Sequence, residues 1–257
     1  MRPMTRHLLS LLATGVFAAL ALGTSKPSPE EEKKRAEEQV QLRALYDDWV
    51  KKVGSGYEKI SSMAKTGMAE KACDGPALLA LAKEDHQLRI PTVYGPFLSR
   101  FASANKSDWQ EDKSPWAFLT ESTFRGHFEK HASERDAYAL DGTARFIKND
   151  WQKNRFLIVL WPDDEKANRL PLLGADKSFE SGSFKGWLLM LDSVDANVVC
   201  QKQLAVESSE KVTSGQTFNK DPQKAIVKDF QDRFEAQLEA ALPPKVKSTN
   251  NMGSLLK

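Results

Sequence analysis

The chain has 257 residues, of which 40% are hydrophobic, 9% aromatic and 28% charged. These proportions are typical of a globular protein and exclude a disordered, collagen-like or multi-span membrane chain. The formal net charge is only +2 and basic residues do not cluster with aromatic ones, so no nucleic-acid binding is expected.

Residues 1–23 predict a secretory signal peptide. Arg2 and Arg6 precede an apolar stretch at residues 8–22, which ends in the small-residue exit Ala21-Leu22-Gly23. A helix of that length spans roughly 22 Å, less than a hydrocarbon core of about 30 Å. We therefore expect cleavage after Gly23, a periplasmic or secreted location and no membrane insertion after cleavage. An uncleaved anchor is the alternative.

Export changes the expected charge and the expected state of the cysteines. The signal peptide holds two of the 37 basic residues and none of the 35 acidic ones, so the mature chain would carry no formal net charge. Cys73 and Cys200 are the two cysteines, and in an oxidising compartment the simplest prediction is a disulfide between them. Two buried free thiols are the alternative, because Cys200 falls in an apolar strand pattern.

Residues 24–39 predict a linker followed by a charged helical stalk. Ser28 as N-cap, Pro29 at the first helical position and Glu31 form a capping-box pattern. From residue 40 onward, apolar side chains recur at helical spacing: Leu42, Leu45, Tyr46, Trp49 and Val53. Gly54-Ser55-Gly56 predicts a break before a second helix.

The next part of the chain predicts helices separated by an irregular stretch. Asp74-Gly75-Pro76 and Ser114-Pro115 are helix starts. Between these two helix starts, Pro91 and Pro96 are expected to interrupt regular secondary structure. Asp141-Gly142 then has the composition of a two-residue hairpin turn.

Strands are predicted in the second half. Residues 156–161 and 187–191 are apolar at every position, which is typical of central strands covered on both faces. After a turn at residues 192–197, alternate apolar residues predict a strand with one buried face: Val198, Cys200, Leu204 and Val206. The long connection at residues 162–182 is the segment most expected to carry recognition.

The last element is an amphipathic helix. Asp221-Pro222 begins it, Pro243-Pro244 ends it, and a stripe recurs at every fourth position: Ile226, Phe230, Phe234, Leu238 and Leu242. Residues 243–257 are expected to form a flexible tail. Together the elements predict one α+β domain at residues 40–242, with N-terminal helices, an antiparallel meander of four to five strands and a closing C-terminal helix.

The residue pattern at 179–212 resembles one that occurs in other proteins. Gly186-Trp187-Leu188, a turn after Leu191-Asp192, and Val198-Val199-Cys200 occur in an order similar to that of uncharacterised exported bacterial proteins. That family has no assigned activity, so the resemblance implies a β-hairpin with a cysteine and nothing about chemistry.

Two function classes remain. His127 and His131 are four apart on a predicted helix, a spacing that lets two imidazoles bind one metal ion. The intervening residues depart from the zincin pattern, and both rings fall on or beside the apolar face. We expect an exported, non-enzymatic binding or structural module without a cofactor, whose partner is an envelope protein or ligand. The loop at 162–182, or a groove beside the sheet, would hold that partner. A metal-dependent hydrolase using His127 and His131 is the alternative.

Overall fold

The computed structural model describes residues 28–73, 88–102, 116, 119–120, 155–175, 178–209 and 221–248. The chain divides into two units, Met1–Glu37 and Glu38–Lys257. In chain order the elements are α1 (Pro29–Thr66), β1 (Leu88–Ile90), β2 (Thr92–Tyr94), the 3-10 helix η1 (Gly95–Leu98), α3 (Ser99–Ala102), β3 (Phe156–Pro162), β4 (Leu172–Leu173), β5 (Phe179–Glu180), β6 (Ser183–Asp192), β7 (Asn197–Glu207), α7 (Pro222–Ala241) and β8 (Val246–Ser248).

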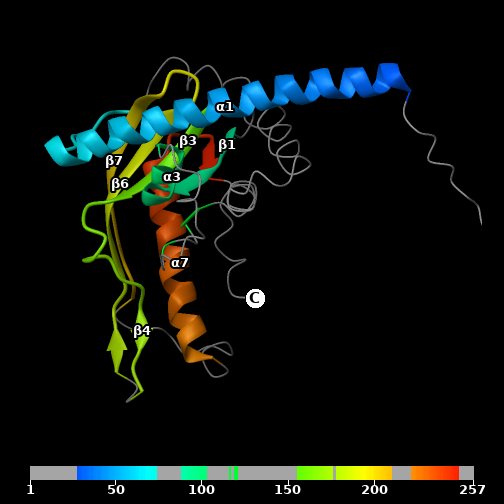
Figure 1. The fold of residues 1–257 in the computed structure, drawn as a ribbon. Helices are drawn as coiled ribbons and strands as arrows, with labels where there is room; N and C mark the ends of the chain where they lie inside the picture. Colours follow the sequence, from blue (N-terminus) through cyan, green and yellow to red (C-terminus); the bar gives the residue numbers. More distant parts are fainter. Residues whose placement is uncertain are drawn as a thin grey trace, which may run out of the picture. The chain divides into compact units, whose positions relative to one another are not determined.

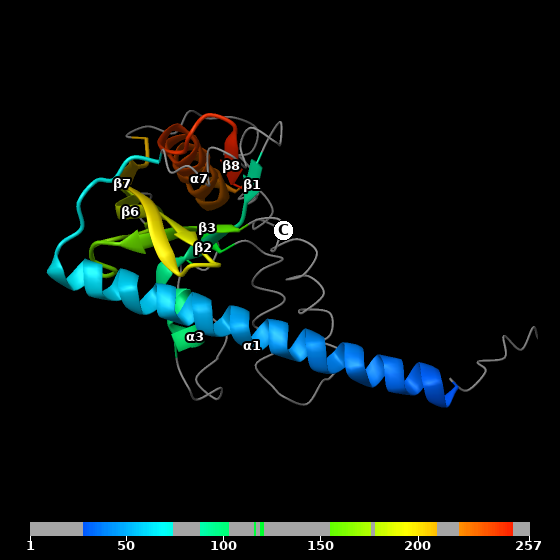
Figure 2. The same ribbon diagram turned by 90° about the horizontal axis from the view of Figure 1, so that it is seen from above.

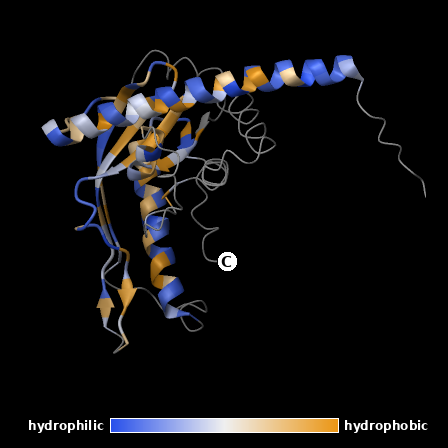
Figure 3. Ribbon diagram, viewed as in Figure 1, coloured by the Kyte–Doolittle hydropathy of each residue, from blue (hydrophilic) through white to orange (hydrophobic). Residues whose placement is uncertain are grey.

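The start of α1 is the predicted capping box. The Ser28 backbone N–H donates to Glu31 Oε2 at 2.7 Å, and the Glu31 N–H donates to Ser28 Oγ at 3.2 Å. The hydrogen bond from the Ser28 backbone lowers the pKa of the exposed Glu31 carboxyl. These first turns are blue in Figure 3, because nearly every side chain is hydrophilic. Ser28 therefore fixes where the helix begins, as its sequence context predicted.

The predicted break at Gly54-Ser55-Gly56 is wrong, because α1 continues through it to Thr66. Both glycines are buried and serve close packing. A Cβ at Gly54 would collide with the carbonyl oxygen of Phe101, and one at Gly56 would lie 2.7 Å from the Leu191 side chain. Glycine is present here because other parts of the fold approach the helix backbone.

The central sheet has four strands in the order β2-β3-β6-β7. Strands β3, β6 and β7 are antiparallel neighbours, whereas β2 runs parallel to β3 with Thr92 opposite Ile158. The fold is thus α+β with a mixed sheet, which corrects the predicted purely antiparallel meander. A three-residue strand shows no alternation that a sequence could reveal, and the long connection between β2 and β3 permits the parallel pairing.

Both faces of the sheet are buried, as the continuous apolar runs predicted. Figure 2 shows α7 on one side of the strands and α1 on the other. On the α7 side the core includes Ile158, Leu188, Leu204, Phe230 and Phe234. On the α1 side it includes Trp49, Val53, Ile60, Val159 and Leu189. The central strands therefore contribute apolar side chains to two cores.

Strand β7 contains a bulge that changes its predicted parity. Met190 pairs with Cys200, but Leu191 pairs with Val198, so Val199 is an extra residue. Cys200, Leu204 and Val206 lie in the core on the α7 side, as expected. Val198 was expected on that face, but it packs against the opposite core. The bulge is the physical reason for this correction.

The turn before β7 is held by a charged side chain. Asp192 is 2% exposed, and its Oδ1 accepts from the Val194 backbone N–H at 3.0 Å. Arg155 Nε donates to both Asp192 oxygens, at 2.7 and 2.9 Å. The hydrogen bond with Asp192 raises the pKa of Arg155. Turn chemistry thus accounts for the acidic residues at this position.

Helix α7 begins and ends where the sequence predicted. Asp221 is the N-cap, and its carboxylate accepts from the Lys224 backbone N–H at 3.0 Å. The helix ends at Ala241, just before the two prolines. Within the segment expected to be a tail, Val246–Ser248 form β8, which pairs in parallel with β1. Figure 1 shows this C-terminal strand in red.

Candidate functional site

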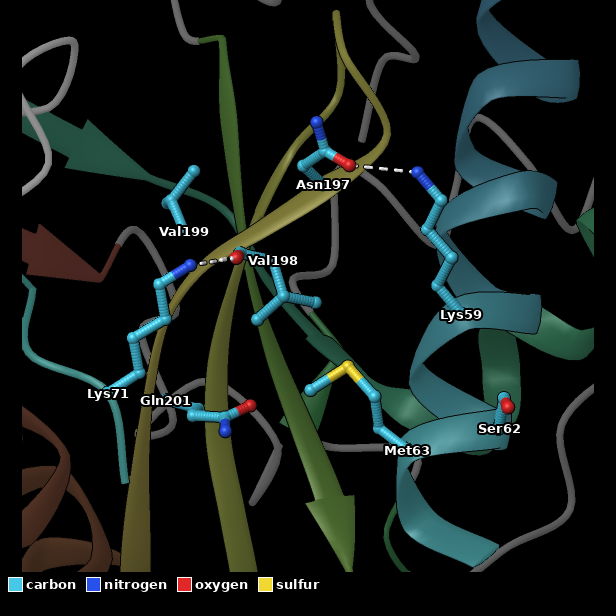
Figure 4. Close-up of a pocket in the computed structure, with 8 residues that line it drawn as sticks. All are labelled: Lys59, Ser62, Met63, Lys71, Asn197, Val198, Val199 and Gln201. Atoms are coloured by element: carbon cyan, nitrogen blue, oxygen red, sulfur yellow. Dashed lines mark hydrogen bonds between the residues drawn. The ribbon is translucent and has the colours of Figure 1, made fainter. Parts of the chain in front are cut away.

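A groove opens between the C-terminal half of α1 and the start of β7. Its volume is about 720 Å³, within the usual range for ligand sites. We call it the α1–β7 groove. It is lined by eight described residues: Lys59, Ser62, Met63, Lys71, Asn197, Val198, Val199 and Gln201. Figure 4 shows α1 on one side of β7 and Lys71 on the other.

Residues 67–73, here called the strap, follow α1 and run along the outer edge of β7. The Lys71 backbone N–H donates to the Gln201 carbonyl at 2.9 Å, and the Gln201 N–H donates to the Lys71 carbonyl at 3.0 Å. The Gln201 side-chain amide donates to the Ala69 carbonyl. The strap therefore pairs with β7 as a short antiparallel strand would.

The predicted disulfide between Cys73 and Cys200 is present and ends the strap. The two Cα atoms are 4.6 Å apart, and the bond closes a sequence separation of 127 residues. Cys200 is fully buried in the core on the α7 side. The covalent bond thus ties the strap, which supplies Lys71 to the groove, to the centre of the domain.

Two ammonium groups approach adjacent residues of β7, Lys59 from α1 and Lys71 from the strap on the other side of the strand. Lys59 Nζ donates to Asn197 Oδ1 at 2.8 Å, and Lys71 Nζ donates to the Val198 carbonyl at 2.9 Å. Both acceptors are neutral oxygens. Among the described residues, neither lysine forms an ion pair with a carboxylate, so their positive charges stay uncompensated there.

Gln201 lies further along the groove. Its side chain is only 7% exposed, and its Oε1 is buried without a hydrogen-bond partner among the described residues. Leaving such an acceptor unpaired costs about 1–3 kcal/mol. In Figure 4 this oxygen points toward the side on which Met63 lies. The groove therefore contains an acceptor that a ligand N–H or O–H group can satisfy.

The β7 bulge makes this arrangement possible. In a regular strand, residues three apart lie on opposite faces. The extra residue Val199 brings Val198 and Gln201 to the α1 side of the sheet together. Met63 and Val198 are half-buried, pack against the core on the α1 side and add apolar surface to the groove.

The described lining of the groove includes Lys59 and Lys71 and no His, Asp or Glu. The arrangement can hold an anion, donate and accept hydrogen bonds, and pack against an apolar group.

The loop at 162–182 supplies no described residue to the groove lining. His127 and His131 lie outside the described residues. In the loop at 162–182, β4 and β5 form a two-stranded sheet and Leu172 is 51% exposed. Within the part of the chain that the structure describes, no group of three His, Cys, Asp or Glu residues could hold a metal ion.

The lining residues were not predicted from the sequence as binding residues. Lys59 and Lys71 are ordinary helix and loop residues by their neighbours, and Gln201 fits an alternating strand. The only available signal was the pair of cysteines, which predicted that residues near 73 and near 200 lie together.

Comparisons with known proteins place the chain in no family. No protein-family model, no curated protein and no solved structure matches it.

Proposed function

We propose that this protein is an exported binding module that holds its ligand in the α1–β7 groove, without catalysing a reaction. The signal-peptide pattern at residues 1–23 supports export. The Cys73–Cys200 disulfide also supports it, because such bonds persist in oxidising compartments and are rare in the cytosol. Among the described helices, none combines the length and apolar character that crossing a bilayer requires.

The observation that carries the binding proposal is the state of Gln201. Its Oε1 is buried and unpaired among the described residues, in a groove where two lysines also lack carboxylate partners. Buried polar atoms in native proteins are nearly always hydrogen-bonded, so each exception requires an explanation. A ligand in the groove supplies one.

Photo-crosslinking tests this proposal. A benzoylphenylalanine at Ser62, which is exposed and lines the groove, is compared with one at Arg233, which lies on α7 and is 52% exposed. We expect the Ser62 probe, irradiated in the cells that produce the protein, to yield a discrete adduct that the Arg233 probe does not yield. The Lys71→Gln exchange should weaken that adduct. Adducts of equal yield from both positions, or none from Ser62, would contradict the proposal.

A further inference from the structure

We propose that the α1–β7 groove recognises the C-terminal end of a peptide whose last residue is apolar, an inference that rests on the binding function proposed above. Three chemical features of the groove define this ligand. The C-terminal end of one peptide offers a matching partner for each of them.

The first feature is uncompensated positive charge. Three lysines elsewhere in the described chain lie beside carboxylates: Lys52 Nζ is 2.8 Å from Asp48, Lys228 Nζ is 2.7 Å from Asp232, and Lys247 Nζ is 2.9 Å from Glu239. Lys59 and Lys71 instead donate to an amide and a backbone carbonyl. Each ammonium has three donors and these bonds use one. The remaining donors can bind a carboxylate.

The second feature is the unpaired acceptor of Gln201, which lies further along β7. Gln201 Oε1 needs an N–H or O–H donor, which a simple carboxylate or fatty acid chain does not offer. A peptide backbone offers an N–H at each residue. Val198 lies opposite Leu191 and Gln201 opposite Leu189, so the bulge shortens their separation along β7 to that of two residues, roughly 7 Å. A carboxylate at the lysines and a backbone N–H at Gln201 thus fit the last two residues of an extended peptide.

The third feature is the apolar surface of the groove. Met63 reaches from α1 toward β7 beside Val198 in Figure 4, and both side chains are half-buried. Methionine adapts its shape to different apolar groups. An apolar terminal side chain would bury against these residues, whereas a charged one would lose its hydration there. Capture of a terminal carboxylate beside a pocket for one side chain is an established mode of peptide recognition.

Fluorescence anisotropy with synthetic peptides tests the inference on the oxidised protein. The probes are labelled octapeptides that differ only in the last residue, each prepared as a free acid and as a C-terminal amide. We expect the acids ending in Leu or Val to bind and their amides to bind at least tenfold more weakly, because the amide removes the charge that the lysines hold. Added salt should weaken the acids more than the amides.

Groove variants locate the binding. Lys59→Gln and Lys71→Gln should each weaken the acid peptides roughly three- to tenfold. Lys185→Gln, an exposed lysine on the adjacent strand β6, is the matched control and should change nothing. Met63→Ala should reduce the preference for an apolar last residue while leaving the preference for acid over amide intact.

The outcomes separate this inference from the proposed function. Equal affinity of acids and amides, or no peptide binding while the Ser62 adduct persists, would overturn the peptide inference and leave the binding function standing. If Ser62 yields no adduct and no peptide binds, both fail.

Discussion

Gln201 contributes to the strap and to the groove through different atoms. Its backbone pairs with Lys71, its amide nitrogen donates to Ala69, and its Oε1 faces the groove. A sequence shows only an ordinary polar strand residue at this position. Its role depends on a strap that is about 130 residues away in the chain, so no local pattern predicts it.

Tyr46 gives the clearest residue-scale prediction. Burial, with a smaller contribution from the Asp47 carboxylate, raises the pKa of this phenol to about 12, although Arg43 opposes the shift. In the unfolded chain the same phenol loses its proton near pH 10. As the pH rises above 10, ionisation therefore lowers the free energy of the unfolded state before that of the folded state. Stability linked to Tyr46 is complete below pH 10 and is lost between pH 10 and about 12, by up to roughly 2–3 kcal/mol.

The measurement compares the wild type with Tyr46→Phe, by urea unfolding at pH 8, 10 and 11.5. Other tyrosines and lysines titrate in both proteins, so the difference between the two curves isolates Tyr46. We expect the wild type to lose more stability than the variant above pH 10. Parallel curves would show that Tyr46 ionises as easily in the folded state as in the unfolded one.

At the scale of elements, boundaries marked by capping residues were predictable and those set by packing were not. Ser28 and Asp221 begin α1 and α7 as predicted, because each cap is a local hydrogen bond. The continuation of α1 through Gly54 depends on Phe101, and the face of Val198 depends on a bulge. Strands β1 and β8 are three residues each and pair across most of the chain. No local sequence pattern indicates the continuation of α1, the face of Val198 or the pairing of β1 with β8.

A substitution at Gly54 tests the close packing of α1 against Phe101. In a helix interior, Gly→Ala normally stabilises by about 1 kcal/mol. We expect Gly54→Ala instead to destabilise by roughly 1–3 kcal/mol, because its methyl group would collide with the Phe101 backbone. Ser55→Ala is the matched control, half-buried in the same turn, and should change stability little. An increase in the unfolding midpoint of Gly54→Ala would contradict the close packing of α1.

At the scale of the whole molecule, the disulfide connects stability with the groove. The bond closes a loop across 127 residues, and constraining the unfolded chain in this way stabilises the folded state by up to about 5 kcal/mol. We expect the reduced wild type to unfold at lower urea than the oxidised protein, with a loss of roughly 2–5 kcal/mol. Reduced and oxidised proteins have the same sequence, so no substitution confounds the comparison. Coincident unfolding curves would contradict a structural role of the bond.

The sequence predicted the existence of this bond but not what it builds. Cys73 and Cys200 could be paired by elimination, since they are the two cysteines of a chain expected to be exported. That the strap between α1 and Cys73 would pair with β7 and bring Lys71 to Val198 depends on three segments meeting in space. The groove therefore exists only in the folded chain, where α1, the strap and β7 come together.

We propose that the protein functions outside the reducing cytoplasm with Cys73 bonded to Cys200, because that bond holds the strap that lines the groove. Intact mass spectrometry of the protein recovered from its producing cells, after alkylation without reduction, tests it most directly. We expect a chain that lacks residues 1–23, carries no alkyl group and is lighter by two hydrogen atoms than the dithiol. A chain that retains residues 1–23, with both cysteines alkylated, would contradict it.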